Sequence, residues 1–257
     1  MLVPLITQAE KQKRRKKTRE KRQRSGRRCR PLPACKPGAD QAFKEFKLAV
    51  FYDEEQTRRY VCGTSGDHTQ AGRMMRRMAT QIQLAGAQEK IANVDGAPWI
   101  RNEIELHGLV DEIGLDYYHL RDYVQRTRLA VYGDEAEGQA WRNEIMKLFY
   151  EQGYRAAHQR LLAWRKDLRG GKRAAADHLM QYIEERQAMI HYPRFRARGL
   201  QIGSGPTEAQ CKSTTQRLKG RGRRWDRANA EAIMALDCLD NSHLWQLRWL
   251  TPCQANS

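Results

Sequence analysis

The chain has 257 residues, and its 47 lysines and arginines outnumber its 30 acidic residues, which gives a formal net charge of +17. A chain of this length forms one large domain or two small ones, and its charge indicates a polyanion as partner rather than an acidic small molecule. No apolar stretch approaches the roughly 20 residues that span a bilayer. The six cysteines form no CxxC pair, so we expect no zinc site but reduced thiols in a cytoplasmic protein.

The positive charge is concentrated in the first 36 residues, where fourteen cations and two acids supply +12 of the +17. The opening MLVPLITQ is too short for a signal peptide, and the basic residues follow the apolar stretch instead of preceding it. The like-charge block Lys11–Arg30 cannot bury a core, so we expect residues 1–42 to be disordered when unbound. This segment is either a solvated tail or a non-specific phosphate-binding arm, and the two roles are compatible.

Residues 43–120 alternate between strand and helix patterns, as an α/β layer does. FKLAVFY and RRYVCGT are rich in β-branched and aromatic residues, and DEEQ between them predicts a hairpin turn. AGRMMRRMATQIQLAGA has apolar residues at helical spacing, which predicts an amphipathic helix with a methionine stripe facing the core. KIANVDGAPWIRNEI predicts a strand ending at Asp95 and a helix with Pro98 near its start. IGLDYYHL predicts a second short strand that carries Asp116 and His119.

Residues 121–200 change to long, charged, helix-favouring segments punctuated by glycines, which predict an all-helical insertion. Residues 201–257 contain NAEAIMALDCLDNSHLW, an amphipathic helix that most simply closes the core. We therefore expect an α/β fold in which two core segments, 43–120 and 201–257, flank a helical block.

Three acids stand out by position: Asp95 at a strand end, Asp116 in the next strand and Glu208 in the first turn of a helix. Carboxylates of this kind that converge can hold Mg²⁺, which prefers hard oxygen ligands. Each acid also has a structural role open to it. Asp95 could form a tight turn, Glu208 could cap its own helix, and Asp116 with His119 could be either a buried pair or support for a metal ligand.

The motifs VDGAPWIRNEI, IGLDYYHLRDYV and IGSGPTEAQCKSTTQRLKGRGRRWDRANAEAIMAL resemble the ISKra family of bacterial insertion-sequence transposases, over residues 43–249. The resemblance implies a DDE transposase with an RNase H-like mixed sheet and an all-helical insertion before the last catalytic helix. It implies that Asp95 and Glu208 are the second and third catalytic acids, which hold two Mg²⁺ (or Mn²⁺) ions. His119 matches a recurrent histidine of that region. Two such ions stabilise the attacking and leaving oxygens of a phosphodiester exchange.

The first catalytic Asp of the family has no match in this chain. In the family it lies upstream of the stretch that matches FKEFKLAVFY, on a strand ending in a DGG-like context, and the acids before that stretch here lie in no such strand. LVPLI could replace part of this strand, but Pro4 lacks the N–H that a central strand needs. We therefore expect a chain that is truncated at its N-terminus and lacks the first strand.

Basic residues follow Glu208 on the same helix and in the loop after it. Lys212 lies four positions further on, on a neighbouring helix face, where it could contact a phosphate beside the metal. RLKGRGRR is cationic and loosened by glycine, which suits contacts to the DNA backbone. Trp225 could stack on an unpaired base or pack against the sheet. The DNA-binding residues that we expect are Lys212, Arg217, Lys219, Arg221, Arg223 and Arg224.

The function that we expect is Mg²⁺-dependent DNA strand cleavage and strand transfer of an insertion sequence, by a homodimer associated with the nucleoid in the bacterial cytoplasm. Its partners would be the terminal inverted repeats of the element and the target DNA, with no membrane involved. A first alternative is a catalytically inactive DNA-binding remnant of such a transposase, which lacks the first Asp. A second alternative is a basic RNA-binding structural protein led by its tail.

Overall fold

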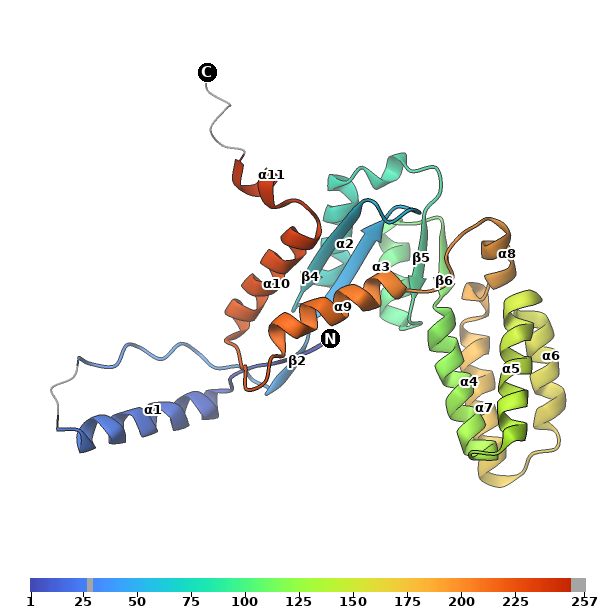
Figure 1. The fold of residues 1–257 in the computed structure, drawn as a ribbon, viewed down its shortest axis with the longest axis horizontal. Helices are drawn as coiled ribbons and strands as arrows, with labels where there is room; N and C mark the ends of the chain where they lie inside the picture. The colour runs from blue at the N-terminus through green and yellow to red at the C-terminus, as the bar shows by residue number, and fades with distance from the viewer. Residues whose placement is uncertain (27–29, 251–257) are drawn as a thin grey trace, which may run out of the picture. The chain divides into compact units, whose positions relative to one another are not determined.

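The protein is described by a computed structural model over residues 1–26 and 30–250, so Cys29 and Cys253 lie outside the described residues. It divides into two compact units (Figure 1): the first comprises Met1–Met78 and Pro206–Ser257, and the second comprises Ala79–Gly205. The fold is mixed α/β and mostly helical, with small sheets, in agreement with the expected α/β class. None of the helices in the described part is long and apolar enough to span a bilayer.

The first unit contains the predicted hairpin. Strands β3 (Lys47–Tyr52) and β4 (Arg59–Thr64) pair antiparallel along their whole length. The turn between them is held by Asp53, whose carboxylate accepts hydrogen bonds from the Thr57 hydroxyl at 2.5 Å and the Arg58 main-chain N–H at 3.0 Å. The hairpin was predictable because its strand and turn signals are local.

A short N-terminal strand contributes to the core of the same unit. Strand β1 (Leu2–Pro4) pairs antiparallel with β2 (Phe43–Glu45), and Val3 and Leu5 are fully buried. Both side chains belong to an apolar cluster whose other buried members are Phe46, Val61, Leu218, Ala230, Met234 and Cys238. The first five residues are therefore structured, although the sequence pattern indicated disorder.

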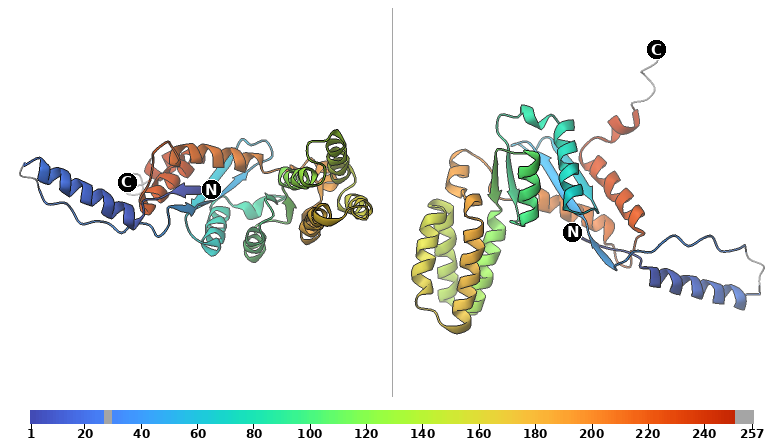
Figure 2. Two further views of the ribbon diagram at one scale, coloured as in Figure 1. Left: turned by 90° about the horizontal axis from the view of Figure 1, so that it is seen from below. Right: turned by 180° about the vertical axis from the view of Figure 1, so that it is seen from behind.

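The basic block is helical over α1 (Gln8–Arg24), where disorder was expected. Its start is fixed by a capping box, in which the Thr7 hydroxyl accepts the Glu10 main-chain N–H and the Glu10 carboxylate accepts the Thr7 N–H. No residue of α1 is buried, so the helix adds nothing to the core. Figure 2 shows residues 30–38 running back alongside it.

The remaining helices of the first unit cover the hairpin and the cluster. In α2 (His68–Gln81) the predicted methionine stripe is present, with Met75 buried. The chain returns to this unit with helices α9 (Gly205–Leu218) and α10 (Arg227–Asn241), and α10 packs against β4. A last helix, α11, covers Trp245–Leu250.

The second unit is built on two parallel strands, β5 (Ile91–Val94) and β6 (Glu112–Leu115). The connection between them contains α3 (Pro98–His107), which begins at Pro98 as predicted. A short 3₁₀ turn, η1 (Leu84–Gly86), precedes β5.

The prediction for IGLDYYHL was wrong in its second half. Strand β6 ends at Leu115, and helix α4 (Tyr117–Tyr132) begins two residues later. Asp116 is the N-cap of α4, since its side chain accepts the main-chain N–H of His119. The two tyrosines favour a strand by composition, but the cap and the apolar periodicity that follows select a helix.

Residues 121–200 are mostly helical, as the sequence predicted. Figure 1 shows α4, α5 (Ala136–Glu151), α6 (Tyr154–Arg165) and α7 (Gly170–Glu185) packed side by side as a bundle. Aromatic side chains fill part of it, with Trp141 and Trp164 in ring contact at 4.4 Å between centroids. A 3₁₀ turn, η2 (Gln187–Met189), and a short helix, α8 (Tyr192–Ala197), return the chain toward α9.

Candidate metal centre and nucleic-acid interface

Two acids lie together where the parallel strands of the second unit end. Val94 and Leu115 are the last paired residues of β5 and β6, and Asp95 and Asp116 follow them directly. The main-chain N–H of Asp116 extends the ladder by donating to the Val94 carbonyl at 2.8 Å. Because the carboxyl ends of adjacent parallel strands share one sheet edge, both carboxylates emerge at that edge.

Asp116 is fully buried, and each of its carboxylate oxygens accepts a main-chain hydrogen bond. Oδ1 accepts the His119 N–H at 2.8 Å, and Oδ2 accepts the Ser204 N–H. The contact with His119 is therefore a helix cap made through the main chain. A buried carboxylate needs such partners, since an unpaired one would be strongly disfavoured.

Asp95 is exposed and sits in the tight turn that its sequence indicated. Its Oδ1 accepts the Ala97 N–H at 2.9 Å. Gly96 has φ +85°, in the region that favours glycine, and a Cβ there would lie 2.7 Å from Nε of Arg186. That Nε donates to the Gly96 carbonyl at 3.0 Å, so the turn is held from the helical bundle.

Tyr182 and Arg186 complete this part of the site, and sequence reasoning missed both. Burial is the largest cause that raises the pKa of Tyr182 to about 12. Arg186 lowers this pKa, and Tyr123, then Asp95 and Asp116, raise it further. The guanidinium carbon of Arg186 lies 4.1 Å from the centroid of the Tyr182 ring. Both residues come from the end of α7, some ninety positions from Asp95, so no local signal could have found them.

The loop before α9 is fastened to the same strand ends by hydrogen bonds within the second unit. Asn93 Nδ2 donates to the Gln201 carbonyl at 2.9 Å, and the Tyr117 N–H donates to the Ile202 carbonyl at 2.9 Å. The bond from the Ser204 N–H to Asp116 is the third. Because Ser204 directly precedes Gly205, the first residue of α9, these bonds also fix where α9 begins.

The other two predicted site residues lie in first turns of helices. His119 is in the first turn of α4, and Glu208 is exposed in the first turn of α9, in the first unit. Asp116 and His119 could each offer one ligand atom to a metal ion. Asp116 thus joins the predicted metal-binding residues. The pairing of Asp95 with Glu208 stays a prediction.

The donors of this set suit a divalent cation. Carboxylate oxygens are ligands for Mg²⁺ and Mn²⁺, and a neutral imidazole nitrogen can bind Mn²⁺. Within the described residues, no lysine or arginine pairs with the carboxylate of Asp95 or Asp116. A buried carboxylate bonded only to neutral N–H groups is an anion to which a metal ion would bring the missing positive charge.

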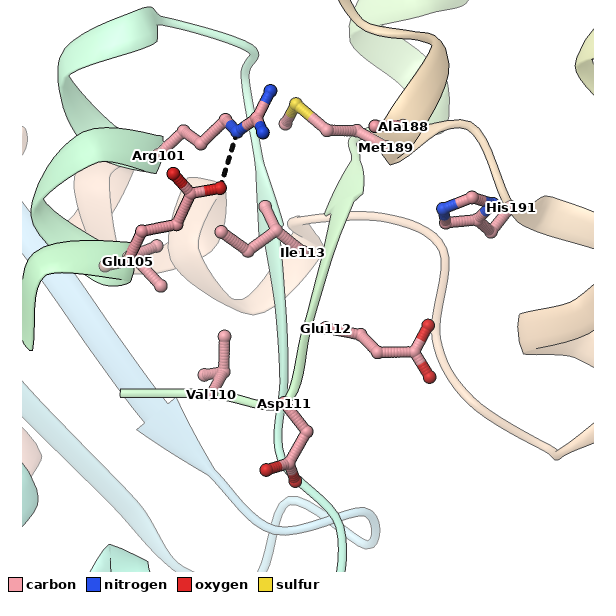
Figure 3. A pocket seen from close by; sticks show the side chains of 10 residues that line it. Arg101, Glu105, Val110, Asp111, Glu112, Ile113, Ala188, Met189 and His191 are labelled. Carbon is pink, nitrogen blue, oxygen red and sulfur yellow. Dashed lines mark hydrogen bonds and ion pairs between the residues drawn. The ribbon is translucent and has the colours of Figure 1, made fainter. Parts of the chain in front are cut away.

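The second unit also has a pocket of about 250 Å³ (Figure 3), and none of the candidate metal-binding residues lines it. The walls of the pocket come from α3, β6, η2 and His191. Each acidic residue in these walls already forms an ion pair. Glu105 pairs with Arg101 at 2.7 Å, the pair dashed in Figure 3. Asp111 pairs with Lys90 at 3.2 Å, and Glu112 pairs with two arginines that follow η2. We therefore place no chemistry in this pocket.

The six cations expected to bind DNA all belong to the first unit, and all are exposed. Arg217 also has a structural role, because its Nε lies 2.9 Å from Oδ1 of Asp237, a buried acid of α10. Arg223 donates to the Arg217 carbonyl at 2.7 Å, which folds the glycine-rich loop back on α9. Arg224 pairs with Glu10 at 2.7 Å.

Trp225 is half-buried and packs against the core of the first unit. The ring packs against the apolar cluster of the first unit, and its Nε1 donates to the Leu218 carbonyl at 2.7 Å. Its main chain bridges to the N-terminal strand segment, with the Ile6 N–H donating to the Trp225 carbonyl at 2.9 Å. Of the two roles open to this residue, packing is the one observed.

Comparison with known proteins adds no relative to this picture. No family model, no curated protein and no solved structure matches the chain.

Proposed function

We propose that the protein is a DDE-type DNA transposase of the ISKra type, with an RNase H-like catalytic core, that cleaves and transfers DNA strands with bound Mg²⁺ or Mn²⁺. The observation that carries this proposal is the placement of Asp95 and Asp116 at the ends of adjacent parallel strands. Ligands commonly bind in α/β sheets at the carboxyl ends of the strands.

Glu208 is assigned to the same centre by its place in the chain. Helix α9 begins at Gly205, directly after the residue whose N–H binds Asp116. Glu208 is three residues further on, and three residues advance an α-helix by about 4.5 Å. In this proposal Asp95, Asp116, His119 and Glu208 hold the metal, and Asp116 occupies a position for which the sequence indicated only a supporting role.

A metal ion bound there would supply charge neutralisation at the phosphate and a lowered pKa for an attacking water. Side chains from the end of α7 position the acids and add a hydrogen-bond donor. Arg186 and the Asp95 turn fix each other through the Gly96 carbonyl. Tyr182 keeps its proton at neutral pH, because its pKa is about 12, and so offers a neutral O–H donor beside the two acids.

The exposed cations of α9 and of the loop after it provide the contacts to DNA backbone in this proposal. Phosphate contacts position a duplex without reading its sequence. Lys212, Lys219 and Arg221 are exposed, and no ion pair among the described residues occupies them. Because transposition joins DNA ends in pairs, the proposal includes a homodimer.

The test is metal-dependent nicking of a supercoiled plasmid, a substrate that requires no knowledge of the terminal repeats. With Mn²⁺ or Mg²⁺ the wild-type chain should convert the plasmid to the open-circular form. Asp95→Asn, Asp116→Asn and Glu208→Gln should each lower the rate by at least the roughly 10–100-fold that changes around a metal site cost. Chelation by EDTA should abolish nicking.

Glu105→Gln is the matched control, since it removes one exposed carboxylate of the same unit that pairs with Arg101 outside the proposed centre. Its rate should equal that of the wild type. Plasmid binding without nicking, unchanged in all four variants, would reject the enzyme and favour the inactive DNA-binding remnant.

A further inference from the structure

Helix α1 has one face that is occupied by its own chain. Lys11 donates to the carbonyls of Lys36 and Pro37 at 3.0 Å, Arg15 to that of Pro33 at 2.6 Å, and Arg22 to that of Arg30 at 2.6 Å. Successive residues of an α-helix rotate by about 100°, so these three cations fall within about 40° of each other. They are the half-buried cations of the helix, and they fasten it to the returning segment 30–38.

The opposite face of α1 carries cations that are left to solvent. By the same rotation, six exposed lysines and arginines fall within about 160° centred on the far side. They are Lys13, Arg14, Lys16, Lys17, Lys21 and Arg24. Like charges three and four positions apart destabilise a helix by about 0.2–0.5 kcal/mol per pair. This surface is therefore maintained against its own repulsion, and a polyanion would relieve it.

The helix is also joined to the basic loop that follows α9. Glu10 pairs with Arg224 at 2.7 Å, and Lys11 pairs with Asp226. Helix α1 and the returning segment 30–38 together form an arm. Thr7 forms a parallel bridge with Ala39, which holds the two ends of this arm together at its base. The base of the arm is thus anchored on the core of the first unit, beside the exposed cations of the loop.

We propose that α1 is a DNA-binding arm that lies against duplex DNA and holds its phosphates without reading sequence. The 17 residues of the helix extend over about 26 Å, and a helix of about 10–12 Å diameter enters the major groove of B-DNA, about 12 Å wide. This inference deepens the proposed function by naming the surface that grips the duplex.

Two other polyanions suit the helix less well. A membrane-surface helix needs an apolar face to insert among lipids, and Ala9 is the one apolar residue between Gln8 and Arg24. Duplex RNA has a deep, narrow major groove that does not admit such a helix. DNA is therefore the partner to which the arm is assigned.

The experiment measures binding of the full-length chain to a labelled DNA duplex of mixed sequence by fluorescence anisotropy, in EDTA. Salt is varied between about 50 and 200 mM, because the logarithm of the affinity falls with the logarithm of salt by about 0.9 per phosphate neutralised. The arm variant carries Lys13→Gln, Lys17→Gln, Lys21→Gln and Arg24→Gln. Glutamine has nearly the helix propensity of lysine and arginine, so α1 is retained. The salt slope should fall by up to about 3.6.

A matched control removes the same charge from exposed sites of the helical bundle, through Lys147→Gln, Arg155→Gln, Lys166→Gln and Lys172→Gln. Its salt slope should change by less than about 1. Equal slopes in the two variants would overturn the proposal, because net charge and not the arm would then determine binding. Duplex RNA bound as tightly as DNA, or anionic vesicles bound in place of DNA, would overturn it as well.

The two proposals can fail separately. The binding assay contains no metal, so loss of nicking in the carboxylate variants leaves it unaffected. Conversely, an arm variant with the wild-type salt slope would reject the arm while the metal centre stands on the nicking assay.

Discussion

Asp116 shows how local structure can fix a buried carboxylate in position. Its first oxygen caps α4 and its second holds the loop that leads into α9. These two bonds fix the carboxylate in position, at full burial, without neutralising its charge. A pre-positioned anion of this kind binds a cation without the entropic cost of ordering its side chain.

The nearby phenol provides a pH-dependent prediction at the same scale. The pKa of Tyr182 rises from 10.0 to about 12 on folding, so the native state holds the proton more tightly than the unfolded state. Its contribution to stability is present below pH 10 and is lost as the pH rises toward 12. Urea unfolding at pH 9 and pH 11 should therefore show a smaller fall in unfolding free energy for Tyr182→Phe than for the wild type. Identical falls would show that folding does not raise the pKa of this phenol.

The role of a residue could be predicted from the sequence where its signals lie close to it in the chain. Asp95, with its turn, and Glu208, in its first helical turn, could be assigned because Asp-Gly and Gly-Pro signals lie beside them. Tyr182 and Arg186 act on Asp95 only through the packing of α7 in the bundle. Because these residues lie some ninety positions from Asp95, no short motif in the sequence indicates that contact.

At the scale of elements, local signals again separate what was predictable from what was not. The hairpin β3–β4 and helix α3 have strand, turn and cap signals within their own length. The N-terminal segment has two buried residues, Val3 in β1 and Leu5 directly after it, but the pairing of β1 with β2 connects segments some forty positions apart and includes a proline at an edge position. The start of α1 was readable from the spacing Thr7-x-x-Glu10, a capping box that the surrounding charge obscured.

The role of the N-terminal strand segment can be measured as a stability change. Leu5 is fully buried in the apolar cluster, so Leu5→Ala should lower the unfolding free energy of the first unit by about 2–5 kcal/mol. Lys17→Ala, in the exposed part of α1, should change it by no more than about 0.5 kcal/mol. Thermal or urea denaturation followed by tryptophan fluorescence compares the two. A Leu5→Ala protein as stable as the Lys17→Ala protein would remove residues 1–5 from the core.

For the whole molecule, the charge and the acids are distributed differently. The excess positive charge lies in the first unit, on α1 and the α9 loop, whereas Asp95, Asp116 and His119 lie in the second. Helix α9 belongs to both in sequence, because it begins at the last residue of the second unit and carries Glu208 into the first. In the proposed transposase the first unit supplies most of the charge that holds DNA.

The most direct measurement of the central claim is Mn²⁺ binding by the full-length chain, followed by the electron paramagnetic resonance of free Mn²⁺. We expect saturable binding by the wild type and by Glu105→Gln, and binding weakened at least tenfold in Asp116→Asn and in Glu208→Gln. Equal Mn²⁺ affinity in all four proteins would contradict it.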